Sequence, residues 1–325
     1  MSLNLKNDHK LLAQWYKKNK RALPWRASKD PYRIWLSEVM LQQTTVVAVI
    51  PYFEKFVTLF PRVEDLAAAP ENEVMEAWAG LGYYSRARNL HKAAKALAEH
   101  GFPKTAAELL ELPGFGPYTS RAVASIAFGE KVGVLDGNVI RVLSRRYGLK
   151  LEWWNSKGRQ ELQGLSDELS LLGEPDVINQ GLMELGATVC TPKKVLCLMC
   201  PWASSCVSHD KNLVDKLPLQ KPRKKSETWV WKPLVSIKNN QVALIKNDYA
   251  PFLKGQMIFP GEISFEKNKP KAYNAKHNIT HHDIFIQITE KKSLSGKNLE
   301  WVNIKELKKI NPSSLLQKVL QKVQG

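Results

Sequence analysis

The sequence contains no apolar run approaching the roughly 20 residues that a membrane-spanning helix requires, so we expect no membrane partner. Residues 1–10 are polar and charged at the place where a secretory signal carries its apolar core, and we expect no such signal. Cysteine is scarce, with four in 325 residues, which excludes a disulfide-dense extracellular scaffold. Together these absences predict a cytoplasmic protein.

Acidic residues are fewer than basic residues. The chain has 31 Asp and Glu residues against 48 Lys and Arg residues, a formal net charge of +17. Without a membrane anchor, a surplus of this size favours a nucleic-acid partner and a nucleoid-associated location. A basic surface with no such partner is the alternative, and charge alone does not separate the two.

All four cysteines fall in one short stretch with the spacing C-x6-C-x2-C-x5-C, namely Cys190, Cys197, Cys200 and Cys206. Four thiolates in one loop suit a zinc ion or an iron–sulfur cluster. Structural zinc sites usually take their ligands as two separated pairs, whereas a graded run in one compact loop favours a 4Fe–4S cluster. Two disulfides are the third alternative, and they are rare in a reducing compartment.

The chain divides into a helical region, a linker and a region of strands. Residues 1–209 are predicted to be mainly helical, and residues 210–227 form a basic, proline-broken linker. Residues 228–325 are predicted to form a smaller α+β domain. The expected helices in the first region cover residues 31–44, with Asp30 as N-cap, and residues 105–111, 117–128 and 138–147.

In the last region, two strand-like runs flank the turn residues Asn239 and Asn240, which predicts a β-hairpin. Residues 283–288 alternate in the manner of a strand. Residues 311–312, Asn-Pro, are expected to begin a final amphipathic helix.

A Gly-x-Gly turn, Gly114-Phe115-Gly116, lies between two predicted helices. Glycines allow backbone N–H groups to approach a phosphate, and the helix that follows adds a favourable dipole. Such a turn would bind the DNA backbone without reading bases. A plain helix–helix turn is the alternative, and the basic charge favours phosphate binding.

Two carboxyl groups are candidates for chemistry. Asp136 stands between an apolar run and a helix start, where it is expected to act as an N-cap and to stay ionised. Glu38 lies on an apolar helix face, where desolvation would raise its pKa and favour the protonated form. A partly exposed helix glutamate is the alternative for Glu38 alone. One raised carboxyl group and one ionised carboxylate together match the two-acid arrangement of glycosidic bond cleavage.

At these residues the chain resembles the MutY-type adenine DNA glycosylases of the endonuclease III superfamily of helix–hairpin–helix, iron–sulfur repair enzymes. The resemblance covers about residues 10–209 and implies a helix–hairpin–helix six-helix barrel with an iron–sulfur cluster subdomain. The matching segments, besides the cysteine loop, are LPWR (23–26), PYRIWLSEVMLQQT (31–44), GLGYYSRARNLHKAA (80–94), LPGFGPYTS (112–120) and LDGNVIRVLSR (135–145).

The resemblance implies catalytic roles for four residues. Glu38 would protonate N7 of a flipped-out adenine and later activate water. Asp136 would stabilise the oxocarbenium-like sugar, and Asn138 would help to hold the site. Tyr118 would line the pocket near the sugar.

It also implies a DNA interface. Trp25 and Arg26 would contact the extruded base, and Gln43 and Tyr83 would wedge into the duplex at the lesion. Gly114 and Gly116 would bind backbone phosphate. The four cysteines would hold a 4Fe–4S cluster that acts mainly as a structural and DNA-binding element.

The last region resembles the Nudix-like module of the same family more faintly. The acidic R-E-x-x-E-E run of nucleotide hydrolases is absent, so we expect no such hydrolysis. In the family this module recognises 8-oxoguanine through a Phe-Ser-His loop, and the corresponding residues here would be Ile279, Thr280 and His281. Ordinary loop residues are the alternative for Thr280 and His281, and His282 is expected to serve packing or to face solvent.

The sequence therefore predicts a monomeric base excision repair enzyme that removes adenine mispaired with 8-oxoguanine, or with guanine, in double-stranded DNA. Two alternatives remain: an endonuclease III-like pyrimidine-lesion glycosylase and lyase, and a non-catalytic iron–sulfur protein that binds DNA damage.

Tyr118 generates a test of these alternatives. Relatives with lyase activity carry a lysine at this position, and a phenol cannot form a Schiff base with the sugar. The chain is therefore predicted to be monofunctional and to leave an abasic site. Borohydride added during turnover should trap no covalent protein–DNA adduct, and an abundant trapped adduct would favour the endonuclease III-like alternative.

Overall fold

The computed structural model describes residues 4–222, 225–296, 298–311 and 313–324. The chain forms two compact units, Met1–Lys221 and Pro222–Gly325, and each is described by itself. The first unit is helical and the second is an α+β unit, which confirms the predicted fold class. No helix within the described ranges has the length and apolar character needed to cross a membrane.

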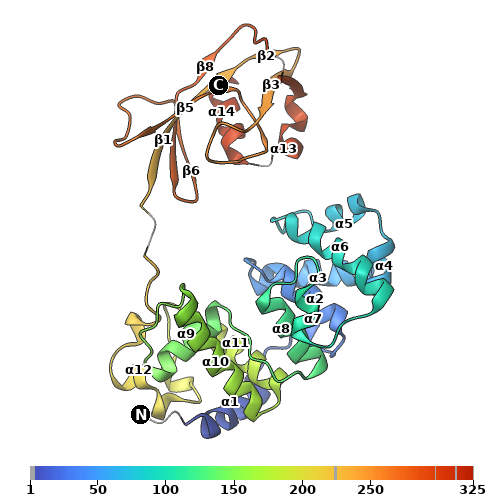
Figure 1. The fold of residues 1–325 in the computed structure, drawn as a ribbon, viewed down its shortest axis with the longest axis vertical. Coiled ribbons are helices and arrows are strands. Elements are labelled where there is room, and N and C mark those ends of the chain that lie inside the picture. Colours follow the sequence, from blue (N-terminus) through green and yellow to red (C-terminus); the bar gives the residue numbers. More distant parts are fainter. Residues whose placement is uncertain (1–3, 223–224, 297, 312, 325) are drawn as a thin grey trace. The chain divides into compact units, whose positions relative to one another are not determined.

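The first unit consists of two groups of helices, which Figure 1 shows as separate lobes. One group contains α2 to α8, and the other contains α1 and α9 to α12. The two groups meet where α8 packs against α11. The helices are α1 (Leu5–Asn19), α2 (Pro31–Met40), α3 (Val46–Leu59), α4 (Val63–Ala68), α5 (Glu71–Ala77), α6 (Ser85–His100), α7 (Ala106–Leu110), α8 (Pro117–Phe128), α9 (Gly137–Tyr147), α10 (Ser156–Leu172), α11 (Pro175–Thr188) and α12 (Val207–Asp210).

Helix α2 begins as predicted and ends earlier than predicted. The Asp30 side chain caps it by accepting a hydrogen bond of 2.9 Å from the Tyr32 N–H. The helix ends at Met40 rather than at residue 44, because the Arg86 guanidinium binds the carbonyl oxygens of Met40 and Gln42 at 3.0 and 2.6 Å. These contacts satisfy carbonyl groups that a helix end leaves without a partner.

Aromatic side chains hold the first group together. Trp35, Phe53, Phe56 and Trp78 are fully buried in its core. The Trp35 ring of α2 stacks on Phe115 at a centroid distance of 5.3 Å, so the turn between α7 and α8 is fixed against the helix that carries Glu38.

The division between the units lies inside the stretch 210–227, but the first part of this stretch differs from the expected linker. Leu217 is 3% exposed, and its carbonyl accepts a hydrogen bond of 2.9 Å from the buried Arg145 side chain. Trp153 donates to the Leu219 carbonyl at 2.8 Å. The basic, proline-broken composition of this segment gave no indication of these contacts with the first unit.

The second unit contains two sheets. In the first, β1 (Glu227–Val235) pairs antiparallel with β5 (Gly261–Glu266) and parallel with β7 (His282–Ile286), which pairs antiparallel with β6 (Ala275–Ile279). β8 (Thr289–Glu290) also pairs with β1. In the second sheet, β3 (Gln241–Lys246) pairs with β2 (Ile237–Lys238), β4 (Met257–Ile258) and β9 (Glu300–Asn303).

The predicted hairpin is confirmed, since Asn239 and Asn240 join β2 to β3 with φ angles of 48° and 59°. Such left-handed angles suit asparagine in a two-residue turn. The short helix α13 (Leu307–Ile310) precedes α14 (Ser314–Gln324), whose buried face contains Leu315, Leu316, Val319 and Leu320. Pro312, at the predicted helix start, lies outside the described residues.

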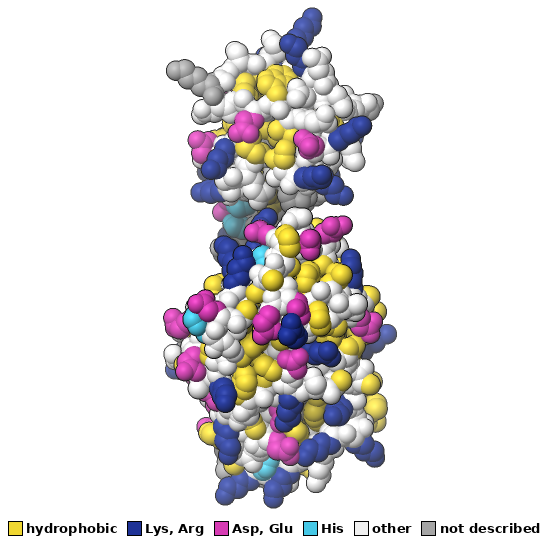
Figure 2. Space-filling model, turned by 90° about the vertical axis from the view of Figure 1, so that its right-hand side faces the viewer, with side chains coloured by type: hydrophobic (Ala, Val, Ile, Leu, Met, Phe, Trp, Pro, Cys, Tyr) yellow, Lys and Arg dark blue, Asp and Glu magenta, His cyan; other side chains and the backbone are white. Residues whose placement is uncertain are grey.

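Figure 2 shows lysine and arginine side chains distributed over both units on the visible face. They are interspersed with acidic and hydrophobic side chains rather than gathered in one patch. The charge surplus is therefore a general property of this face, and the site must be located from its chemistry.

The turn before α8 gives a stability prediction. Gly114 has a φ of +79°, and an added Cβ would lie 2.7 Å from the Asn89 Cβ atom, which cannot rotate away. Gly114→Ala should therefore lower the free energy of unfolding by about 2–3 kcal/mol. Gly116→Ala is the matched control, because its φ is −99° and an added Cβ meets no atom within 4 Å. The control should cost at most about 1 kcal/mol. Equal losses in chemical denaturation would contradict this explanation.

Candidate active site

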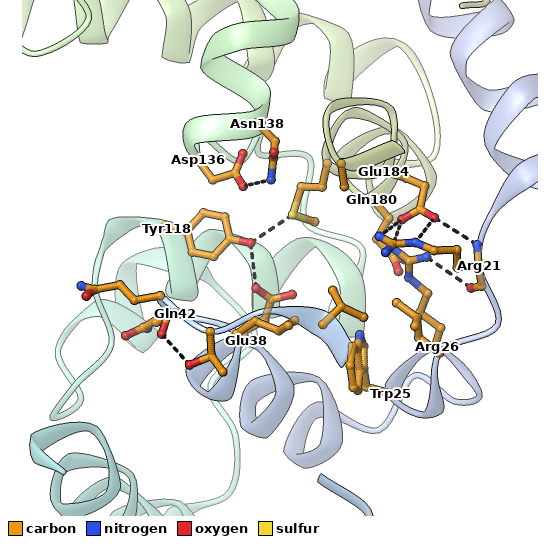
Figure 3. A pocket seen from close by; sticks show the side chains of 17 residues that line it. Arg21, Trp25, Arg26, Glu38, Gln42, Tyr118, Asp136, Asn138, Gln180 and Glu184 are labelled. Carbon is orange, nitrogen blue, oxygen red and sulfur yellow. Dashed lines mark hydrogen bonds and ion pairs between the residues drawn. The ribbon is translucent and has the colours of Figure 1, made fainter. Parts of the chain in front are cut away.

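A cavity of about 500 Å³ opens between the two helix groups of the first unit. Helices α2, α3, α8, α9 and α11 and the short 3-10 helix η1 (Pro24–Arg26) contribute to its wall (Figure 3). Glu38 comes from α2, Tyr118 from α8 and Asp136 from the start of α9, while Gln180, Met183 and Glu184 come from α11. Carboxyl groups that are distant in sequence therefore face one cavity.

Glu38 lies in the wall of this cavity and is only 7% exposed. Its Oε2 accepts a hydrogen bond of 2.7 Å from the Tyr118 hydroxyl. Burial raises the pKa of Glu38 from 4.5 to about 7; the hydrogen bond from Tyr118 opposes this rise, and the charge of Asp136 adds to it. A large fraction of this carboxyl group is therefore protonated at neutral pH.

Tyr118 supplies the contact that orients Glu38. Burial and the neighbouring carboxylates raise the pKa of Tyr118 well above the usual value. The phenol therefore stays neutral and donates a hydrogen bond to Glu38. The same hydroxyl lies 3.0 Å from the Met183 sulfur, a weak acceptor. The residue at this position is a hydrogen-bond donor without an amine.

Asp136 is the N-cap of α9, as predicted. Its Oδ1 accepts a hydrogen bond of 2.7 Å from the Val139 N–H, and its Oδ2 accepts one of 2.9 Å from the Asn138 side chain. The pKa of Asp136 is raised, because the effect of burial exceeds the opposing effect of these hydrogen bonds. The sequence predicts an ordinary ionised carboxylate, and the raised pKa differs from that expectation. Both oxygens nevertheless serve as acceptors, which favours the ionised form.

Sequence reasoning missed an ion-pair network at the cavity rim. Glu184 on α11 has a fully buried side chain that contacts Arg21 at 2.7 Å and Arg26 at 2.9 Å. Burial would raise the pKa of Glu184, but hydrogen bonds from Arg21 and Arg26 outweigh it and lower the pKa to about 2. The network fixes the segment that carries Trp25 to α11.

The two residues expected to wedge into DNA, Gln43 and Tyr83, both have left-handed backbone angles, with φ of 58° and 48°. Tyr83 is 59% exposed. Arg86 lies between their loops: its guanidinium donates to the Gln42 carbonyl at 2.6 Å and to the Gly82 carbonyl at 3.3 Å. It also packs against the Tyr83 ring, with its central carbon 5.4 Å from the centroid. One half-buried arginine therefore holds both loops.

Seven of the twelve predicted catalytic and DNA-contact residues share the cavity, and the other five lie elsewhere. Its wall includes Trp25, Arg26, Glu38, Gln43, Tyr118, Asp136 and Asn138. Tyr83, Gly114 and Gly116 belong to the first unit but not to this wall. Thr280 and His281 belong to the second unit, at the turn between β6 and β7.

The four cysteines are free and surround a second, small cavity, together with Val189, Val195 and Val214. This geometry does not support the disulfide alternative. Four thiol groups around one cavity are a donor set that suits a zinc ion or an iron–sulfur cluster.

Arginines of α9 hold the cysteine loop. Arg145 donates to the Thr191 carbonyl at 2.7 Å and lies 3.5 Å from the Cys190 sulfur. Arg146 donates to the Ser205 carbonyl and to the buried Asp8 carboxylate, the latter at 2.8 Å. The loop is thereby connected to α9, and through Asp8 to α1.

The comparisons with known proteins agree with this geometry. Residues 36–165 match the family model described as HhH-GPD superfamily base excision DNA repair protein. An adenine DNA glycosylase of Buchnera aphidicola subsp. Schizaphis graminum is 32% identical over 340 residues, which covers 96% of this chain and 97% of that protein. The human adenine DNA glycosylase is 45% identical over 212 residues, covering 62% of this chain and 39% of the human protein.

A solved structure of a thermostable thymine-DNA glycosylase is also similar, with a TM-score of 0.58 and 29% identity. The similarity covers 64% of this chain and 97% of that one. Fold and site thus define a helix–hairpin–helix protein of the base excision DNA repair superfamily. Within it, the chain belongs to the adenine DNA glycosylase family, because its match to the Buchnera protein spans nearly the whole of both chains.

The buried position of Glu38 predicts a pH-dependent stability difference. A pKa raised from 4.5 to about 7 means that the folded state binds the proton more tightly than the unfolded state. Stability is therefore lost as pH rises from about 4.5 to 7, by about 3 kcal/mol in total. Glu38→Gln should be more stable than the wild type above pH 7, and the gain should shrink toward pH 5.

Chemical denaturation at several pH values measures this difference. Glu161→Gln, at an exposed position on α10, is the control and should show little dependence of this kind. A stability difference between Glu38→Gln and the wild type that stays constant with pH would contradict the assignment.

The compact run of four free cysteines predicts the metal content. Protein purified without oxygen should be brown, absorb broadly in the visible range and contain about four iron atoms per chain. Cys200→Ser should lose most of this iron. A colourless wild-type protein with one tightly bound zinc ion would support the zinc alternative.

Proposed function

We propose that this protein is an adenine DNA N-glycosylase that removes adenine mispaired with 8-oxoguanine or guanine in double-stranded DNA. It acts as a monomer and hydrolyses the N-glycosidic bond. The observation that carries the proposal is the buried Glu38, whose pKa of about 7 keeps much of it protonated, in the same cavity as Asp136. A proton donor and a carboxylate acceptor at one site suit the departure of a base.

Glu38 acts first as an acid. Its carboxyl group donates a proton to the ring nitrogen N7 of the extruded adenine, which makes the base a better leaving group. The Tyr118 hydroxyl, 2.7 Å from Oε2, holds the carboxyl group in place. After the base departs, the carboxylate form of Glu38 accepts a proton from the attacking water.

Asp136 stabilises the positive charge that develops on the sugar. Its carboxylate is fixed by the Val139 N–H and the Asn138 side chain, so it needs little reorganisation during the reaction. Tyr118 offers no amine for a Schiff base, and the product is therefore an abasic site. The same feature argues against the endonuclease III-like alternative.

The DNA interface surrounds the cavity. Trp25 and Arg26 contact the flipped base, and Gln43 and Tyr83 enter the gap that it leaves in the duplex. Arg86 positions both wedge loops through the carbonyls of Gln42 and Gly82. Gly114 and Gly116 bring backbone N–H groups near a phosphate at the start of α8.

Cys190, Cys197, Cys200 and Cys206 hold a 4Fe–4S cluster in this proposal. When bound, the cluster would cross-link the four cysteines of the loop and so support a surface for DNA. Arg141 contributes to the loop from α9, with a hydrogen bond of 2.7 Å to the Cys190 carbonyl. Lys193 and Lys194 in the same loop are exposed and available to phosphate.

The second unit reads the base opposite the adenine. Thr280 is exposed at the tip of the β6–β7 hairpin, with a φ of 54°. Its hydroxyl oxygen can accept a hydrogen bond from an oxidised purine, and the His281 imidazole lies beside it on the same turn. We also propose that this unit is related to the Nudix-like module of the family.

Single-turnover excision tests the function. Duplexes with adenine opposite 8-oxoguanine, guanine or thymine are incubated with excess protein and then treated with alkali. Adenine loss should be fastest opposite 8-oxoguanine, and Glu38→Gln should reduce it about 10²-fold or more while it retains binding. Equal rates opposite 8-oxoguanine and guanine would remove the role of Thr280. No adenine loss by cluster-containing wild type would overturn the proposed function.

A further inference from the structure

Three potential metal ligands meet on the second unit, away from the cysteines. Glu227 is the first residue of β1, and His281 and His282 lie at the end of the β6–β7 hairpin. The Glu227 N–H donates to the His281 carbonyl at 2.8 Å, and Glu227 pairs with His282 in the sheet register. The backbone therefore brings one carboxylate and two imidazoles together.

The distances between their side chains suit an ion better than direct hydrogen bonds. His281 Nε2 lies 3.6 Å from Glu227 Oε1, and His282 Nε2 lies 3.3 Å from Oε2. A good hydrogen bond from a cationic nitrogen to a carboxylate is about 2.7–2.9 Å long. Ligands held about 2.0–2.1 Å from a tetrahedral metal ion are roughly 3.3–3.4 Å apart, which is close to both distances.

Thr280 determines which nitrogen of His281 is available. The Thr280 hydroxyl donates to the Ile279 carbonyl at 2.7 Å, so it can only accept a hydrogen bond from His281 Nδ1, 3.3 Å away. This contact places a proton on Nδ1 and leaves the Nε2 lone pair toward Glu227. A metal ion placed between this lone pair and the carboxylate would be bound by both groups.

Trp229 contacts the other two groups. The Trp229 N–H donates to Glu227 Oε2 at 3.0 Å, and the Trp229 ring packs edge-on against His282. His282 Nδ1 is buried without a hydrogen-bond partner, so the polar contact of this ring falls on Nε2. Outer contacts that fix a carboxylate and an imidazole are a regular feature of metal sites.

We propose that Glu227, His281 and His282 bind a divalent transition-metal ion of the zinc type. Two imidazoles and one carboxylate are a donor set that zinc prefers, and the partial exposure of all three side chains leaves a fourth position to water. The bound ion cross-links the tip of the β6–β7 hairpin to the first residue of β1. His282, expected from the sequence to serve packing or face solvent, becomes a ligand.

Zinc binding by the full-length protein, with its cysteine loop loaded, tests this site. A chromophoric chelator competes for zinc near neutral pH, and the chain should retain one zinc ion that is independent of the cysteines. His282→Gln and Glu227→Gln should each weaken zinc binding roughly tenfold or more. His277→Gln is the matched control, because it lies on β6 of the same hairpin and outside the cluster.

Thermal unfolding gives a second, independent comparison. Saturating zinc should raise the Tm of the wild type and of His277→Gln, and it should leave His282→Gln unchanged. Glu227→Gln, at a side chain that is 40% exposed, provides the comparison if the histidine variant fails to fold. Equal zinc affinity in all these proteins, or no zinc retained by the wild type, would overturn the site and leave a proton-bridged His–Glu cluster.

Discussion

The hydrogen bond between the Tyr118 hydroxyl and the buried Glu38 carboxyl group is the contact on which the active-site chemistry depends. It joins α2 to α8, and so it fixes the acid against the helix that follows the glycine turn. Burial raises the pKa of Glu38, and the neutral Tyr118 phenol limits this rise through its hydrogen bond. Greater exposure of α2 to solvent would bring the pKa of Glu38 closer to its ordinary value.

Buried and half-buried arginines hold the backbone segments that carry functional side chains. Arg86 binds carbonyls of two loops, Arg145 and Arg146 hold the cysteine loop, and Arg26 joins the Trp25 segment to Glu184. Because a planar guanidinium offers five donors, one side chain can satisfy several carbonyls that leave regular structure. Arg86, Arg145 and Arg146 therefore have a structural role in the first unit.

The sequence predicted the features that depend on a residue and its near neighbours in the chain. Asp136 as an N-cap, Glu38 on an apolar face and the asparagine turn at 239–240 depend on local pattern. Sequence reasoning missed Glu184 and the true end of α2, because both depend on partners distant in sequence, Arg21 and Arg86. The Glu227–His281–His282 cluster was missed for the same reason, since strand register alone brings Glu227 to the histidines.

The ionisation of Glu38 in the folded protein tests the central claim most directly. Infrared difference spectra between the wild type and Glu38→Gln, recorded across a pH series, isolate the carboxyl stretch of this one residue. The protonated band should persist to neutral pH and disappear with a midpoint near 7. A midpoint near the ordinary value of 4.5 would show that the cavity does not retain the proton, and would contradict the assignment of Glu38 as the acid.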